Sequence, residues 1–232
     1  MKIGIVQPYF FPYIGYFQLI HSVDKFVFFD DVNFMKKKWI NRNQILISGR
    51  SSFITVPLKN VSQNKLILKT EIAADEKWKP KLLTGIRSAY GRTPMFKSVF
   101  SLVEDILNRN HIYISKLATE SIISVSRYLG IQTQFVYSSS IYQNCHLKAQ
   151  DRILDICQQE GASEYLNPIG GTELYSKDEF AARGLRLHFV KPFPGSYSQF
   201  KFAFVPFLSI IDVLMFNSIG TIRKMLNRCE LI

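Results

Sequence analysis

The chain has 232 residues with a formal net charge of +11, and hydrophobic residues make up 47% of it. This apolar content excludes a disordered chain and is enough for a sizeable core. The positive charge favours anionic partners such as nucleic acid, an anionic membrane surface or phosphorylated metabolites. The three cysteines lie far apart and offer neither a disulfide framework nor a closely spaced ligand pair, which favours a reducing, cytoplasmic location.

The first predicted elements form a strand–helix–strand unit. Residues 2–7 are a continuous run rich in β-branched side chains, which is typical of a short buried strand. A loop broken by prolines and Gly15 follows, residues 16–21 can form one or two helical turns, and residues 25–29 read as a second strand. Such a unit favours two parallel neighbouring strands joined by a right-handed connection.

Apolar residues change their period at Trp78, where a helical pattern begins. Helices are predicted at residues 78–90, 96–109, 113–129, 149–159, 172–183, 209–216 and 221–228. Further strands are predicted at residues 45–47, 53–58, 66–72, 133–137, 164–167 and 185–190. The expected fold is α/β: a Rossmann-like, mainly parallel sheet with helices on both faces, in a single domain over 1–232 with a helical subdomain around 78–129. Residues 202–216 are the most apolar stretch, but they are too few to span a bilayer.

The loop over residues 7–16 is the first candidate site. In parallel α/β sheets, ligands bind beyond the carboxyl ends of the strands, and helix N-termini attract phosphate. Gly15 permits a close backbone approach, and we expect Gln7 and Tyr16 to contact substrate. The alternative is a hydrophobic loop packed on the domain, because its prolines remove backbone donors.

The second candidate site begins with Asp30 and Asp31, at the end of the second predicted strand. A carboxylate here can act as a catalytic base on a sugar ammonium or hydroxyl group, or as a hard oxygen ligand of a metal. A basic and amide-rich segment follows, and its side chains are expected to share one pocket with Gln7, Tyr16 and Asp31. The predicted substrate-binding residues of this segment are Lys38, Asn41, Arg42 and Asn43. The alternative is a solvated basic turn.

The third candidate site follows the strand predicted at residues 164–167. Asn167, Gly170 and Gly171 join that strand to a helix, where glycines free the backbone to cradle a substrate. A plain turn is the alternative, since the segment matches neither a Walker A nor a dinucleotide-binding motif. The histidines show no metal-ligand spacing, so the sequence predicts no metal site.

Four segments together resemble the WbqC-like family: residues 7–20, 30–34, 39–43 and 208–217. The resemblance extends over essentially the whole chain. It implies a bacterial protein associated with O-antigen and related surface-polysaccharide biosynthesis, which works in the cytoplasm on sugar intermediates carried on a nucleotide. It assigns no catalytic residue a known role and no cofactor.

The loop around Pro12 also resembles, more distantly, the nucleotidyltransferases of the adenylyl-transferring Rossmann type. In those enzymes the first strand leads into a proline-containing loop and a Gly-His helix start. Here Gly15 is followed by Tyr16 instead of a histidine. This departure argues against nucleotidyl transfer and leaves nucleotide binding as the expectation.

The predicted function is that of an enzyme that transfers an N-acyl or aminoacyl group to a nucleotide-linked amino sugar of O-antigen or lipopolysaccharide biosynthesis. Its partners would be the nucleotide-linked sugar and an activated acyl or aminoacyl donor. No nucleic acid is expected, and at most a peripheral membrane contact. The alternatives are a nucleotidyl- or glycosyltransferase on the same substrates, and a non-catalytic binding protein of the polysaccharide machinery.

Overall fold

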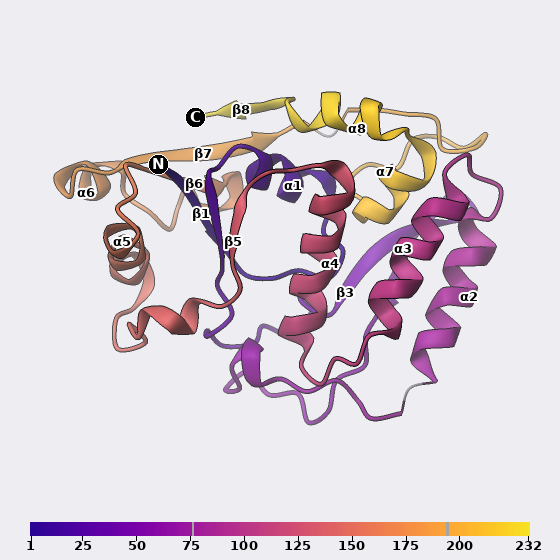
Figure 1. The fold of residues 1–232 in the computed structure, drawn as a ribbon, viewed down its shortest axis with the longest axis horizontal. Helices are drawn as coiled ribbons and strands as arrows, with labels where there is room; N and C mark the ends of the chain where they lie inside the picture. Colours follow the sequence, from indigo (N-terminus) through magenta and orange to yellow (C-terminus); the bar gives the residue numbers. More distant parts are fainter. Residues whose placement is uncertain (76, 194) are drawn as a thin grey trace.

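The fold is a mixed α/β arrangement around one mainly parallel sheet (Figure 1). The computed structural model describes residues 1–75, 77–193 and 195–232. Within these residues six strands pair in the order β5-β2-β1-β6-β7-β8, and only β7 and β8 pair in the antiparallel sense. The strands are β1 Lys2–Val6, β2 Lys25–Phe28, β5 Gln134–Val136, β6 Glu164–Pro168, β7 Arg186–Pro192 and β8 Cys229–Leu231. The expected α/β class with a mainly parallel sheet is confirmed.

The central strand β1 explains the continuous apolar run of the N-terminal segment. It is parallel to β2, with Ile3 beside Lys25 and Val6 beside Phe28, as predicted. Its side chains alternate between two cores: Ile3 and Ile5 belong to one cluster and Val6 to the other. A strand covered on both faces has no polar side, which is why it lacks the alternation of a half-exposed strand. The chain adds β2 and β5 on one side of β1, and later β6 and β7 on the other.

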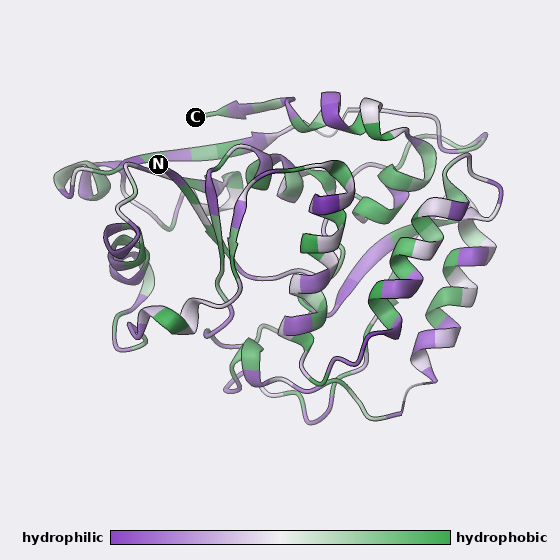
Figure 2. Ribbon diagram, viewed as in Figure 1, coloured by the Kyte–Doolittle hydropathy of each residue, from purple (hydrophilic) through white to green (hydrophobic). Residues whose placement is uncertain are grey.

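Helices pack on both faces of the sheet. The core with Val6 contains residues of α1, α4, α7 and α8, and the core with Ile3 contains residues of α5 and α6. Figure 2 shows bands of hydrophobic and hydrophilic residues along α2, α3 and α4, as expected for helices with one buried face. The helices are α1 Ile14–His21, α2 Trp78–Tyr90, α3 Phe96–Asn108, α4 Ile114–Leu129, α5 Ala149–Gln159, α6 Lys177–Ala182, α7 Ile210–Phe216 and α8 Ile219–Leu226. None of the described helices is both long and apolar enough to cross a bilayer.

A long insertion separates β2 from β5. It starts with an antiparallel hairpin of β3 (Arg42–Ile47) and β4 (Arg50–Thr55), which forms a sheet of its own. It continues through α2, α3 and α4, so the three helices predicted there are confirmed. That this region is a subdomain of a single domain stays a prediction.

Two predicted elements differ from the structure in kind or in starting point, and one strand was not predicted. The strand expected at residues 66–72 is a 3-10 turn, η1 (Ile67–Lys69), flanked by isolated bridges. The helix expected at residues 172–183 begins only at α6, where the Ser176 hydroxyl accepts a bond from the Glu179 amide. Strand β8 was not predicted, because its three residues make a strand only by pairing with β7.

Candidate functional site

A cavity of about 590 Å³ opens at the carboxyl ends of β1, β6 and β7. Its walls come from the loop after β1, from the segment before and at the start of β3, and from the segments after β6 and before α7. The lining residues are Tyr9, Pro12, Tyr13, Trp39, Asn43, Ile169, Lys191, Pro192 and Phe207. Since β1 and β6 are neighbours and the strand order reverses at β1, the cavity lies where ligands bind in open parallel sheets.

The loop after β1 is fixed through its buried phenylalanines. Phe10 and Phe11 are completely buried, which turns Tyr9 and Tyr13 toward the cavity. The Asn43 amide donates to the carbonyls of Phe10 (3.0 Å) and Phe11 (2.8 Å). Phe11 has a φ of 41°, in the left-handed region that a bulky residue adopts only when its surroundings impose it. The loop is therefore a rigid wall of the cavity.

Gly15 is required for the close packing of neighbouring protein segments. A Cβ atom at this position would lie 2.3 Å from the Tyr13 ring and 2.6 Å from the Pro192 Cβ. The close approach that the glycine permits is therefore between α1, the preceding loop and the end of β7. The expectation of a ligand lying directly against this glycine is wrong, because protein atoms fill that space.

Tyr16 and Gln7 lie next to the cavity without lining it. The Tyr16 hydroxyl donates to the Gln7 carbonyl (2.8 Å), and its ring packs 5.6 Å from the rings of both Tyr9 and Phe26. Complete burial raises the pKa of Tyr16 well above its ordinary value. Tyr16 thus supports Tyr9 from behind, and its hydroxyl already has a partner.

Most of the basic segment stabilises the hairpin. The Asn41 amide donates to the Val56 carbonyl (2.9 Å). The Arg42 guanidinium lies 4.5 Å from the Phe53 ring centroid and donates to the Lys37 carbonyl. The side chain of Lys38 is exposed to solvent. The segment thus contributes a hairpin and an exposed cationic surface.

Asn43 is the predicted residue that reaches the cavity. Of the sites predicted from the sequence, only Asn43 is among the lining residues in the described part of the chain. The shared pocket expected of Lys38, Asn41 and Arg42 with Gln7, Tyr16 and Asp31 is not this cavity, because none of the six is among its lining residues.

The segment after β6 contributes Ile169 to the cavity wall. The side chain of Asn167 is buried against Gly171: a Cβ atom there would lie 1.9 Å from the Asn167 amide nitrogen. Gly170 faces open space, and the three residues Ile169–Gly171 form a 3-10 turn, η3. Asn167 and Gly171 thus shape this turn, while their predicted contact with substrate stays a prediction.

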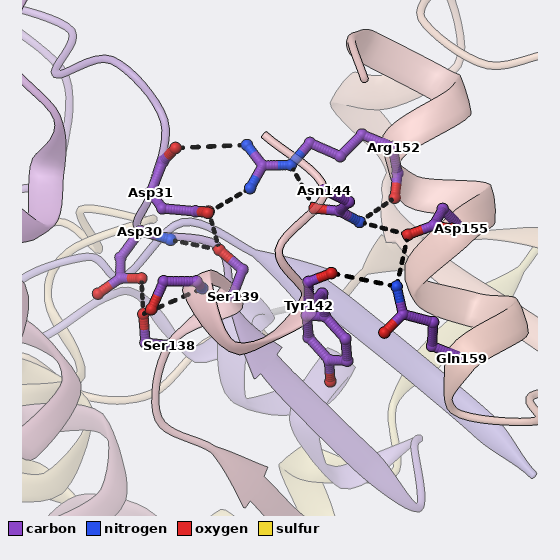
Figure 3. A network of polar contacts seen from close by, with 10 residues as sticks. Asp30, Asp31, Ser138, Ser139, Tyr142, Asn144, Arg152, Asp155 and Gln159 are labelled. Atoms are coloured by element: carbon purple, nitrogen blue, oxygen red, sulfur yellow. Dashed lines mark hydrogen bonds and ion pairs between the residues drawn. The ribbon is translucent and has the colours of Figure 1, made fainter. Parts of the chain in front are cut away.

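Asp30 and Asp31 lie at the same sheet edge, in a polar network on the β2–β5 side (Figure 3). Asp30 is buried and accepts hydrogen bonds from the hydroxyls of Ser115 (2.5 Å) and Ser138 (2.6 Å). Burial raises the pKa of the Asp30 carboxyl, and the bonds from Ser115 and Ser138 partly counter this.

Asp31 is paired with a buried arginine of α5. Its carboxylate forms an ion pair with Arg152 and accepts from the Ser139 hydroxyl, and Arg152 also donates to the Asp31 carbonyl (3.3 Å). The Arg152 Nε donates to Asn144 (2.9 Å), so each of the three guanidinium nitrogens has a partner (Figure 3). Neither aspartate lines the cavity. Their role as bases stays a prediction, while their bonds assign them to the joint between β2, β5 and α5.

Several cavity residues were not predicted. Tyr9 and Tyr13 belong to the loop that was singled out, and aromatic side chains flanking prolines were the available signal. Ile40 anchors the segment before β3 in the core, and its neighbour Trp39 stays partly exposed. Lys191 lies just beyond a predicted strand, and nothing in the sequence pointed to Phe207.

These features define an α/β protein with an aromatic cavity at the carboxyl edge of its parallel strands. The chain belongs to the WbqC-like protein family, whose sequence pattern matches residues 7–224, so the resemblance seen in its motifs is confirmed. It is similar to the uncharacterized protein Rv1507c of Mycobacterium tuberculosis, with 28% identity over 219 residues and 93% of each chain covered. No solved structure matches it.

Proposed function

We propose that the cavity binds a nucleotide-linked amino sugar, and that the protein is a cytoplasmic transferase that adds an acyl or aminoacyl group to it in O-antigen biosynthesis. The observation that carries the proposal is the cavity lining: aromatic faces of Tyr9, Tyr13 and Trp39 with Lys191 at the wall. Aromatic rings stack on bases, and a lysine ammonium binds phosphate as a point charge.

The sheet supports this proposal through its strand order. The arrangement β5-β2-β1-β6-β7 has a Rossmann-like reversal at β1, and nucleotides bind at such reversals. Lys191 forms an exposed ion pair with Glu230 (3.2 Å), which an incoming phosphate can replace at small cost.

The lining also favours one alternative, a binding protein without catalysis. Among the described residues, no carboxylate, histidine or cysteine lines the cavity, and such groups usually supply acid–base or nucleophilic chemistry. Calorimetric titration with nucleotide sugars, followed by a turnover assay with an activated acyl donor, separates the two functions. Binding without turnover would favour the binding protein, and no response to any nucleotide sugar would refute both.

Lys191→Ala is expected to weaken the binding of a nucleoside diphosphate sugar about tenfold or more, because it removes a charge-assisted bond to phosphate. Isothermal titration calorimetry measures the change. The matched control is Lys97→Ala, an exposed lysine of α3 remote from the cavity, which should bind like the parent. Equal losses in both variants would show a general effect of charge and contradict the assignment.

A further inference from the structure

The positive charge of the chain is concentrated in two segments that contain no acidic residue. Residues 32–70 and 180–211 hold 12 of the 29 Lys and Arg and none of the 18 Asp and Glu, which leaves 17 basic against 18 acidic residues elsewhere. The first segment contains the β3–β4 hairpin, and the second runs from the end of α6 through β7 to the start of α7. Both contribute walls of the cavity.

An exposed aromatic rim follows the same two segments. It consists of Trp39, Phe53, Phe202 and Phe207, with exposed fractions of 37%, 52%, 49% and 58%. Trp39 and Phe53 stack with centroids 6.3 Å apart, and Phe202 packs on the hairpin turn at Gly49. The backbone at Ser209 donates to Gln44 of β3 (2.8 Å), which holds the second segment beside the hairpin. The four rings therefore lie on the hairpin, on its approach and on the segment held beside it, and Trp39 and Phe207 reach the cavity itself.

This exposure is imposed by the fold. Single exposed rings are ordinary, but a group of large apolar side chains on one surface marks an interaction site. Phe207 has a φ of 58°, a left-handed conformation that a bulky residue adopts only under constraint. Met35, in the segment that leads to the hairpin, is also exposed, so this stretch offers an aliphatic side chain as well as aromatic ones.

Unpaired cations border the aromatic rim. Lys36, Lys37 and Lys38 directly precede Trp39, Lys201 precedes Phe202, and Arg50 lies at the hairpin turn. All five side chains are exposed, and none forms an ion pair with an acidic residue in the described part of the chain. Aromatic and aliphatic groups bordered by lysines are the combination that binds at the surface of an anionic bilayer.

We propose that this rim docks the protein on an anionic phospholipid bilayer, with the cavity mouth turned toward the membrane surface. The rings enter the headgroup region while the cations meet the lipid phosphates. Single-stranded nucleic acid would use the rings and cations but gain little from Met35, whose side chain has no flat face on which a base could stack. The docking does not depend on a nucleotide sugar in the cavity, so this proposal and the proposed function can fail separately.

The test is sedimentation of the full chain with vesicles of phosphatidylcholine alone or mixed equally with phosphatidylglycerol. The parent should bind the anionic vesicles and lose affinity as salt rises. Two variants should each lose about tenfold or more: Phe53→Ser/Phe202→Ser, and Lys36→Glu/Lys37→Glu/Lys38→Glu. Neither variant replaces a cavity-lining residue, and both should keep the thermal midpoint of the parent. Phe53 stacks on the lining residue Trp39, so the unchanged nucleotide-sugar affinity is expected of the charge-reversal variant.

The matched controls replace the same kinds of exposed side chain, apolar or basic, at positions outside the rim. Ile112→Ser/Leu174→Ser removes exposed apolar groups outside the rim, and Lys81→Glu/Lys97→Glu/Lys224→Glu reverses exposed charges on three helices. The apolar control should bind vesicles like the parent. The charge-reversal control should lose only the small part of the affinity that depends on the net charge of the whole protein. Absent or equal binding to the two vesicle types would overturn the proposal. So would tighter binding to a single-stranded oligonucleotide, or a dimer that Phe53→Ser/Phe202→Ser abolishes.

Discussion

Replacing Arg152 by methionine is expected to lower the free energy of unfolding by about 3–5 kcal/mol. The change leaves the buried carboxylate of Asp31 without its counter-charge, and it also frees the acceptor oxygens of Asn144 and the Asp31 carbonyl. Urea unfolding followed by circular dichroism measures the effect. The matched control is Arg183→Met, because Arg183 forms only an exposed pair with Asp151 (3.8 Å) and should cost less than about 1 kcal/mol.

The double variant Arg152→Met/Asp31→Leu sharpens this test. Removing both charges should recover much of the loss, because no uncompensated ion remains buried. The single variant Asp31→Asn should also be less stable than the parent, because it leaves the Arg152 guanidinium buried without a carboxylate partner. An Arg152→Met protein as stable as the parent would show that the pair is not a structural joint, and the role of Asp31 as a base would regain support.

Asp212→Ala is expected to cost about 3–5 kcal/mol of unfolding free energy. The Asp212 carboxyl is completely buried in α7 and accepts from the hydroxyls of Tyr90 (2.7 Å) and Tyr197 (2.6 Å) and from the Gln199 amide (2.7 Å). Its loss removes the acceptor of the Tyr90 and Tyr197 hydroxyls, while the Gln199 amide keeps its bond to the Val205 carbonyl (3.2 Å). The control Asp105→Ala removes an exposed carboxylate of α3 and should stay within about 0.5 kcal/mol of the parent.

The pH dependence gives the Asp212 prediction a second measurement. Burial raises the pKa of Asp212 above its ordinary value, although the bonds from Tyr197, Tyr90 and Gln199 oppose this. Because the pKa is raised in the folded state, the protonated carboxyl of Asp212 contributes its full share of the unfolding free energy below about pH 4. That share falls as pH rises through the folded-state pKa. The stability difference between the parent and Asp212→Ala should therefore be largest near pH 4 and shrink toward neutral pH. A difference that grows with pH would contradict the raised pKa.

Helices and strands that follow from the local periodicity of apolar residues were predictable from the sequence. The continuous apolar run of residues 2–7 gave β1, and the helical period after Trp78 gave α2, α3 and α4. The 3-10 turn at Ile67–Lys69 was missed because its residues have strand-like composition, while only isolated bridges are available to them there. Propensity cannot show whether a neighbouring strand exists to pair with.

The site was predictable only in its position. The loop after β1 and the end of β2 both lie at the functional edge of the sheet, as their places after predicted strands implied. The partner that pairs with Asp31 is 121 residues further along the chain, and Lys191 and Phe207 join Tyr9 in the cavity from the far end of the sequence. Such contacts form only in the completed fold, so the spacing of nearby residues in the sequence cannot predict them.

The constraint at Phe11 has a consequence for how a ligand enters. Its amide donates to the Ser121 hydroxyl of α4 (3.1 Å), and its carbonyl accepts from Asn43 of β3 and from the Ser209 hydroxyl before α7 (2.8 Å each). One residue thus ties three distant segments to the same wall, so a movement of that wall would have to break all three bonds. Ligand association should then be a single kinetic phase whose rate rises linearly with concentration, without a plateau set by loop closure.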